Sequence, residues 1–191
     1  MRLTSIVLSM ALAANVASAQ VRHFDLKTTA SLGRKLYERS NVSPNSLSPE
    51  SAAAIETAAK ALPQIDLSKY RFEVLEDPAG DAFLVYALAY SKNPDDVVLG
   101  IHYRVSVTHD AKKVKSVEPL SRSALIVKKS AGVPPGAAPV GVWGINLVSP
   151  TPLETHVYLS LLHHTPIFLR MADHSIWKVD GQQIAKVRNA Q

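Results

Sequence analysis

The stretch at 148–187 constrains the fold most, because start and stop signals for a helix are followed there by strand and turn signals. Thr151 precedes Pro152, and a residue before proline is held in the extended conformation that a helix N-cap adopts. Glu154 follows at the spacing of a capping box with Thr151. The sequence therefore predicts a helix from Pro152 to His164, which ends before the next proline.

The residues after this helix predict a strand and then a hairpin. Pro166 to Met171 is mostly apolar and reads as a strand. Asp180 and Gly181 form a dipeptide that favours a two-residue type I′ turn. Such a turn would place Trp177 opposite Ile184, a cross-strand pair that contributes about 0.2 to 1 kcal/mol. We therefore expect a β-hairpin near the end of the chain.

The region at 70–128 has the two-residue period of strands, and short turns rich in Pro, Gly, Asn and Asp interrupt it. Consecutive strands joined by short turns pair antiparallel. Phe83 to Tyr90 is apolar on both faces, so we expect it at the centre of the sheet and under a helix. Val97 to His109 reads as one strand, in which Gly100 indicates a bulge or a close backbone approach. Ala124 to Lys128 is expected to extend the same meander.

These patterns together predict an α+β fold, an antiparallel β-meander covered by two helices, with a C-terminal β-hairpin. The first covering helix is expected at Pro49–Leu62, after a serine that serves as N-cap, and the second is the one described above. Residues 20–48 are expected to form an N-terminal segment and linker, with a short helix at Ser31–Arg39. The remainder, 49–191, is expected to be a single α+β domain. Within it, 130–139 has no periodicity and is expected to be a flexible connector.

The first nineteen residues have the three parts of a secretory signal peptide. Arg2 supplies the positive charge, an apolar stretch follows, and Ala17 to Ala19 forms a small-x-small cleavage site. We expect cleavage near Ala19 and a periplasmic or secreted location. No later stretch is long and apolar enough for a transmembrane helix. The chain has no cysteine, which excludes thiol redox chemistry and Cys-ligated metals.

The charged residues point to no nucleic-acid or nucleotide site. The chain carries a formal net charge of +5, but its basic residues are dispersed among acidic ones. Nucleic-acid binding favours a basic stripe with interleaved aromatic residues, which is missing, so no nucleic-acid partner is expected. The Gly-rich nucleotide-binding fingerprints are missing too, and no cofactor is expected. No G-x-S-x-G elbow marks a catalytic serine.

Histidine is the residue type whose positions suggest chemistry. His156 and His163 share a face of the predicted helix, but seven residues separate them by about 10 Å along its axis. Two zinc ligands on one helix stand four residues apart. A metal site at His156 and His163 is therefore an alternative that needs further ligands, and the leading interpretation holds no metal. His163 and His164 are explained more simply by their favourable interaction with the helix C-terminus.

One part of the sequence resembles a known pattern. The run T-P-L-E-T-H-V-Y-L-S-L-L, followed by P-I-F-L-R and W-K-V-D-G-Q-Q-I, resembles a pattern in a family of exported bacterial proteins of unknown function. The resemblance covers about the last forty residues; it implies export and carries no activity. The order of a helix before a meander is also similar to cystatin-like folds. The Q-x-V-x-G inhibitory motif of those proteins is absent here.

Three hypotheses for the function follow. The leading one is an exported non-catalytic module that binds a protein or an envelope component, because a well-specified scaffold lacks any catalytic constellation. The first alternative is a periplasmic hydrolase that uses His156 with His102 or Arg104 from the sheet. The second is a carrier of a small ligand, held in a cavity between sheet and helix. The oligomeric state is left open.

Overall fold

The structure is a computed structural model that describes residues 21–41, 47–134, 136–137 and 140–187. The predicted signal peptide at 1–19 lies outside these residues, as does part of the connector at 130–139. Within the described residues the α-helices are α1 (Leu26–Ser40), α2 (Pro49–Ala61) and α3 (Glu154–His163), with a 3-10 turn at Leu67–Lys69. The strands are β1 (Tyr70–Glu76), β2 (Phe83–Ala89), β3 (Asp96–Val98), β4 (Tyr103–Val107), β5 (Val114–Pro119), β6 (Ile126–Lys128), β7 (Val142–Asn146), β8 (Ile167–Met171), β9 (Ile176–Asp180) and β10 (Gln183–Lys186).

The strands form two four-stranded sheets and one small ladder. The first sheet has the order β1-β2-β4-β5 and is antiparallel throughout. The second has the order β10-β9-β8-β7; its β7 and β8 are parallel because α3 connects them. β3 pairs with β6 in a separate two-stranded ladder. The predicted α+β class, with antiparallel sheets and a C-terminal hairpin, is confirmed.

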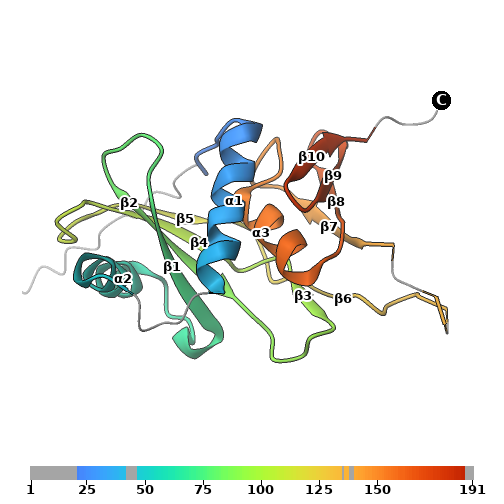
Figure 1. The fold of residues 1–191 in the computed structure, drawn as a ribbon, viewed down its shortest axis with the longest axis horizontal. Coiled ribbons are helices and arrows are strands. Elements are labelled where there is room, and N and C mark those ends of the chain that lie inside the picture. The colour runs from blue at the N-terminus through green and yellow to red at the C-terminus, as the bar shows by residue number, and fades with distance from the viewer. Residues whose placement is uncertain (1–20, 42–46, 135, 138–139, 188–191) are drawn as a thin grey trace, which may run out of the picture.

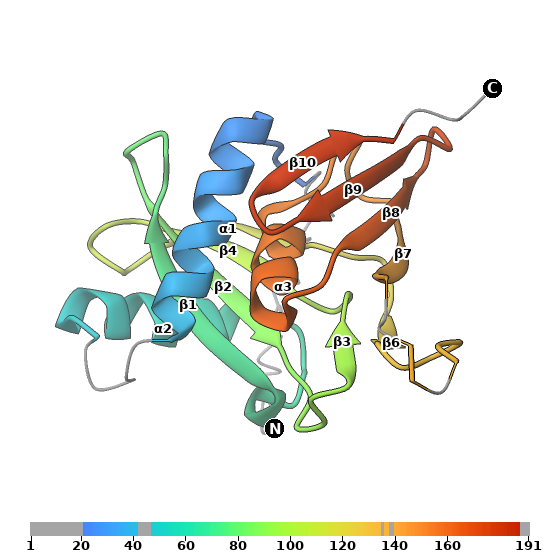
Figure 2. The same ribbon diagram turned by 45° about the vertical axis from the view of Figure 1, so that its right-hand side comes forward.

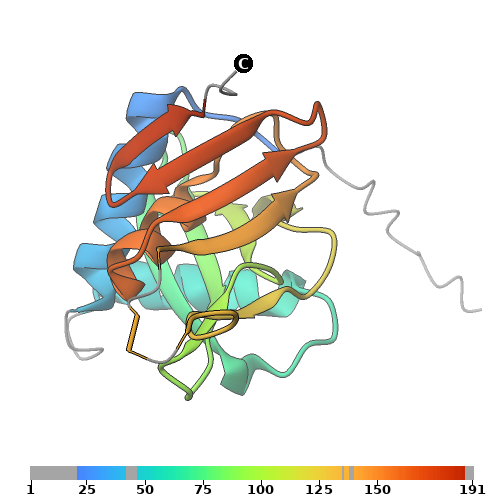
Figure 3. The same cartoon turned by 90° about the vertical axis from the view of Figure 1, so that its right-hand side faces the viewer.

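The elements lie in four layers, as Figure 1 and Figure 2 show. α2 covers one face of the first sheet, where its alanines Ala54 and Ala58 pack against Val85 of β2. α1 and α3 cover the other face and separate it from the second sheet. β2 is therefore central and buried on both faces, as its apolar sequence predicts. Figure 3 looks onto the outer face of the second sheet.

α1 belongs to the main core. It spans Leu26–Ser40, which is longer than the helix expected at Ser31–Arg39, because Asp25 caps it by accepting the N–H of Thr28 at 2.9 Å. Its Leu32 and Leu36 are buried among side chains of α3 and of both four-stranded sheets. The N-terminal segment thus contributes to the same core as the rest of the chain.

The strand expected at Val97–His109 is interrupted near Gly100. A Cβ on this glycine would meet the carbonyl oxygen of Ser123 and lie 2.8 Å from the backbone nitrogen of Leu125, so the close backbone approach is confirmed. Ile101 follows with a φ of 57°. The chain therefore turns between β3 and β4, and β6 pairs with β3 instead of extending the meander.

The hairpin register differs from the expected one. Ile184 lies opposite Val179, and Trp177 lies opposite Lys186, so Trp177 and Ile184 do not face each other across the strands. Positive φ occurs at Gly181 but not at the next residue, which fits a glycine-first turn and not type I′. The shift moves the pairing by two residues, so Trp177 and Ile184 still pack against the core.

The crossing of α1 and α3 depends on Gly33. A Cβ there would touch Val157 and lie 2.6 Å from the carbonyl oxygen of Glu154. Gly→Ala in a helix ordinarily stabilises it by about 1 kcal/mol. We expect Gly33→Ala instead to lower the free energy of unfolding by about 1–3 kcal/mol, because the two helix backbones cannot separate without loss of packing.

Urea unfolding measures this effect. Lys35→Ala, an exposed position in the same helix, is the matched control and should leave the midpoint almost unchanged. A Gly33→Ala protein as stable as the original would show that the helices do not approach this closely.

Candidate functional site

Arg104 is the most deeply buried charged group of the first sheet. It is 1% exposed, and its guanidinium is fully engaged in the interior. Nη1 donates to Glu154, Nε donates to Glu118 at 3.1 Å, and Nη2 donates both to Glu118 and to the carbonyl of Arg22. Burial alone would lower the pKa of Arg104, but the charges of Glu154, Tyr86 and Glu118 outweigh burial and raise it. The arginine therefore stays charged and joins β4, β5, α3 and the N-terminal segment.

The predicted capping box at the start of α3 is wrong, because Glu154 is used in this network. The helix begins at Glu154 and not at Pro152, and the Glu154 side chain is fully buried. Its Oε1 accepts from Arg104 and from the hydroxyl of Tyr86 at 2.9 Å, whereas its Oε2 has no partner among the described residues. The carboxylate thus points into the protein, away from the backbone N–H that a capping box would require.

His102 precedes β4, the strand of Arg104, and both of its ring nitrogens form hydrogen bonds. Its Nδ1 accepts the N–H of Ala89 at 3.0 Å, which leaves Nε2 to donate to the carbonyl of Val98 at 2.8 Å. Burial lowers the pKa of His102 to about 4. The side chain therefore holds together the ends of β2, β3 and β4.

His156 occupies the first turn of α3 and is 4% exposed. Its Nδ1 accepts the N–H of Leu153 at 2.9 Å, so the histidine, and not Thr151, caps the helix start. Burial, together with a smaller effect of the nearby His102, lowers the pKa of His156 to about 3. The structure thus places His156 near His102 in the interior, with both rings neutral at ordinary pH.

His156 and His163, the pair suggested for a metal, have no third ligand grouped with them among the described residues. His163 lies half-buried in the last turn of α3, and His164 forms the C-cap with a φ of 48°. Within the part of the chain that the structure describes, no three His, Asp or Glu side chains are grouped so that they could hold a metal ion. No helix of that part is long and apolar enough to cross a membrane.

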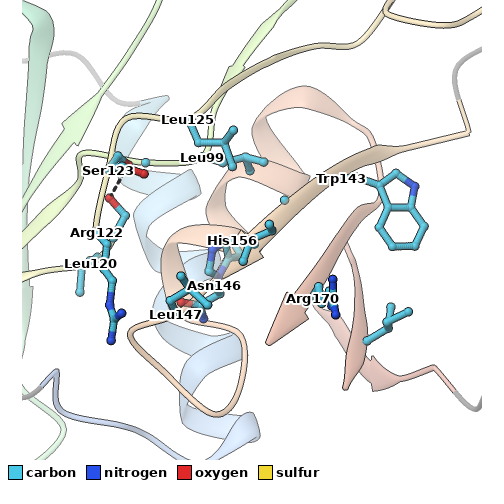
Figure 4. A pocket seen from close by; sticks show the side chains of 15 residues that line it. Leu99, Leu120, Arg122, Ser123, Leu125, Trp143, Asn146, Leu147, His156 and Arg170 are labelled. Atoms are coloured by element: carbon cyan, nitrogen blue, oxygen red, sulfur yellow. Dashed lines mark hydrogen bonds between the residues drawn. The ribbon is translucent and has the colours of Figure 1, made fainter. Parts of the chain in front are cut away.

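A groove with a volume of about 490 Å³ runs along β7. One wall is the chain at 120–125 together with Leu99, the other is the whole of 143–147, and His156 lies at the centre (Figure 4). Trp143 and Arg170 project to the opposite side of β7 from Leu99 and Leu125. Most of the lining side chains are apolar, and the volume is typical of a ligand site.

β7 is the edge strand of its sheet. Among the described residues no strand pairs with its outer edge, although β6 lies nearby. Val142 donates its N–H toward β8, to the carbonyl of Pro166 at 2.9 Å. Because successive residues of a strand alternate, the N–H groups of Trp143 and Ile145 point the other way, toward the groove. Trp143 is 56% exposed and Ile145 is 61% exposed. Trp143 stacks on Phe168 of β8, with ring centroids 4.9 Å apart.

Sequence reasoning missed this groove. The alternation at 142–146 identifies a strand, but the edge position follows from the strand order and from parallel pairing with β8, which local pattern does not reveal. The lack of Lys and Pro within the strand was the available signal, because those residues usually protect an edge. Comparisons with protein-family models, curated proteins and solved structures found no match to this chain.

Removal of Arg104 tests its structural role. Arg104→Met should lower the free energy of unfolding by about 3–5 kcal/mol, because it leaves the buried Glu118 and Glu154 without their partner. Urea unfolding is the measurement, and Lys60→Met in the exposed Glu56–Lys60 pair is the control that should leave the midpoint unchanged. Equal effects of the two substitutions would contradict the assignment.

The buried histidines predict a loss of stability in acid. An unfolded histidine titrates near pH 6.5, but the pKa is lowered to about 4 in folded His102 and about 3 in folded His156. Below about pH 6.5 the two histidines bind protons in the unfolded chain but stay neutral in the folded chain. The free energy of unfolding therefore falls as the pH falls from about 6.5 toward 4. Each histidine contributes up to about 1.4 kcal/mol per pH unit.

Urea unfolding at pH 7 and pH 5 measures this loss. His156→Asn, which removes one of the two buried rings, should reduce the loss by about half. The exposed Lys35→Ala, which leaves both buried histidines in place, should retain all of it. An undiminished loss in His156→Asn would show that His156 is not buried in its neutral form.

Proposed function

We propose that the protein is an exported, non-catalytic binding module that holds an extended segment of a partner protein against β7. The observation that carries the proposal is the unpaired edge of β7, with the N–H groups of Trp143 and Ile145 facing an apolar groove. An extended peptide added to such an edge gains main-chain hydrogen bonds, and pockets beside the edge select its alternate side chains. We further propose that it acts after cleavage near Ala19, in the periplasm or outside the cell.

The exposed side chains of β7 support a protein partner. Folded proteins usually protect an edge strand with charge, proline or a bulge, and β7 has neither Lys nor Pro. Its solvent-exposed side chains, Trp143 and Ile145, are large and apolar. Leu147, just beyond the strand, is also exposed. Aromatic residues are enriched in protein interfaces. An added strand would satisfy the edge and place its own side chains beside these residues.

Charge narrows the choice of partner. The lining residues include Arg122 and Arg170, both exposed, and no aspartate or glutamate. Like charges across an interface oppose binding, whereas opposite charges favour it. The segment that fits the groove is therefore apolar with one or more acidic residues.

A random twelve-residue peptide library selected against the purified protein tests the proposal. The bound peptides are then measured against Ile145→Pro and Ile145→Ala. Proline is tolerated on an edge strand where the N–H of the replaced residue points away from the sheet. Ile145→Pro therefore removes one donor from the outer edge and leaves the hydrogen bonds to β8 in place. We expect Ile145→Pro to weaken binding at least tenfold more than Ile145→Ala, which keeps the N–H.

Two results would contradict the proposal: no peptide enriched above background, or enriched peptides that bind both variants equally.

The same groove also favours a second candidate function, the carrier of a small apolar molecule, because its volume suits such a ligand. A small fluorescent apolar acid, anilinonaphthalene sulfonate, separates the two. One-to-one binding that Ile145→Pro leaves unchanged, without any enriched peptide, would favour the carrier.

A further inference from the structure

His156 presents an unused hydrogen-bond donor to the groove. Its Nδ1 accepts the N–H of Leu153, so the proton of the neutral ring lies on Nε2. The side chain lines the groove, and no hydrogen bond from Nε2 is found among the described residues. Among the described residues Glu154 Oε2 is the one buried polar side-chain atom without a partner, so His156 Nε2 is accessible from the groove. This donor is therefore suited to an acceptor on a bound molecule.

The inward face of β7 beside His156 is closely packed at Gly144. Gly144 of β7 has no side chain, and a Cβ there would lie 2.8 Å from Leu99 and 3.5 Å from Leu125. A strand paired with the edge of β7 turns every second side chain toward this same face. One side chain of the occupant would therefore lie on the side of β7 where Leu99, Leu125 and His156 line the groove (Figure 4).

We infer that His156 determines the specificity of the groove by donating Nε2–H to a side-chain carboxylate of the bound segment. The inference rests on the function proposed above. A neutral histidine can donate to a carboxylate or to an uncharged acceptor, but the charge of Arg122, in the groove wall that contains Leu125, favours the carboxylate. The expected occupant carries an aspartate or glutamate at the inward position, between apolar residues.

Two substitutions separate this role from the cap at the start of α3. In His156→Asn the amide oxygen stands where Nδ1 was and still accepts the N–H of Leu153, but the donor at the Nε2 position is lost. In His156→Gln the terminal amide nitrogen reaches the Nε2 position and keeps the donor, but the cap is lost. If His156 only caps the helix, His156→Gln should weaken binding more than His156→Asn. If His156 donates to the ligand, His156→Asn should weaken binding more.

The test uses the tightest acidic peptide from the selection described above, its Asp→Leu or Glu→Leu derivative at the inward position, and calorimetry. We expect His156→Asn to weaken binding of the acidic peptide about tenfold to a hundredfold, with no effect on the leucine derivative. His156→Gln should bind the acidic peptide within about threefold of the original protein, even though its unfolding midpoint is lower.

Each result decides between the claims. Equal binding by the original protein and His156→Asn, while Ile145→Pro still abolishes binding, would overturn the role of His156 and leave the edge-binding function intact. Insensitivity to Ile145→Pro would overturn the proposed function itself. A loss of binding in His156→Gln alone would assign the histidine to the helix cap.

Discussion

The buried ion pair between Arg104 and Glu154 is the contact on which the arrangement of the layers depends. The arginine comes from the central part of the first sheet, and the carboxylate comes from the first turn of α3. α3 in turn connects β7 to β8, so the pair fixes the second sheet relative to the first. Two charges of opposite sign that are removed from water stabilise a fold only when both remain in place. The walls of the groove beside β7 come from both halves of the chain. The shape of the groove therefore depends on this ion pair.

Much of the fold was predictable from local sequence signals. Proline and serine mark the start of α2, alternation marks the strands of the first sheet, and the run at 83–90 identifies the central strand. The start of α3 was not predictable, because the same spacing of Thr151 and Glu154 suits both a capping box and an inward carboxylate. Only the position of Arg104, fifty residues away in the chain, decides between them.

The candidate site was less predictable than the fold, for a topological reason. Histidines attract attention in a sequence, yet the two ring nitrogens of His102 both bond to the backbone, and all donors of Arg104 point inward. The groove instead depends on which strand ends the second sheet and on the turn at Gly100. Neither property belongs to a short stretch of sequence. Of the histidines considered from the sequence, His156 is the one that lines the groove, and it also caps α3.

Amide hydrogen exchange of β7 with and without a selected acidic peptide is the most direct test of peptide binding at this edge, because it measures the protection of each edge N–H. The amides of Trp143 and Ile145 should exchange rapidly in the free protein and at least tenfold more slowly with the peptide bound. The amide of Gly144, which faces β8, should change little. Unchanged exchange at Trp143 and Ile145 in a saturated complex would show that the peptide binds elsewhere and not at the edge of β7.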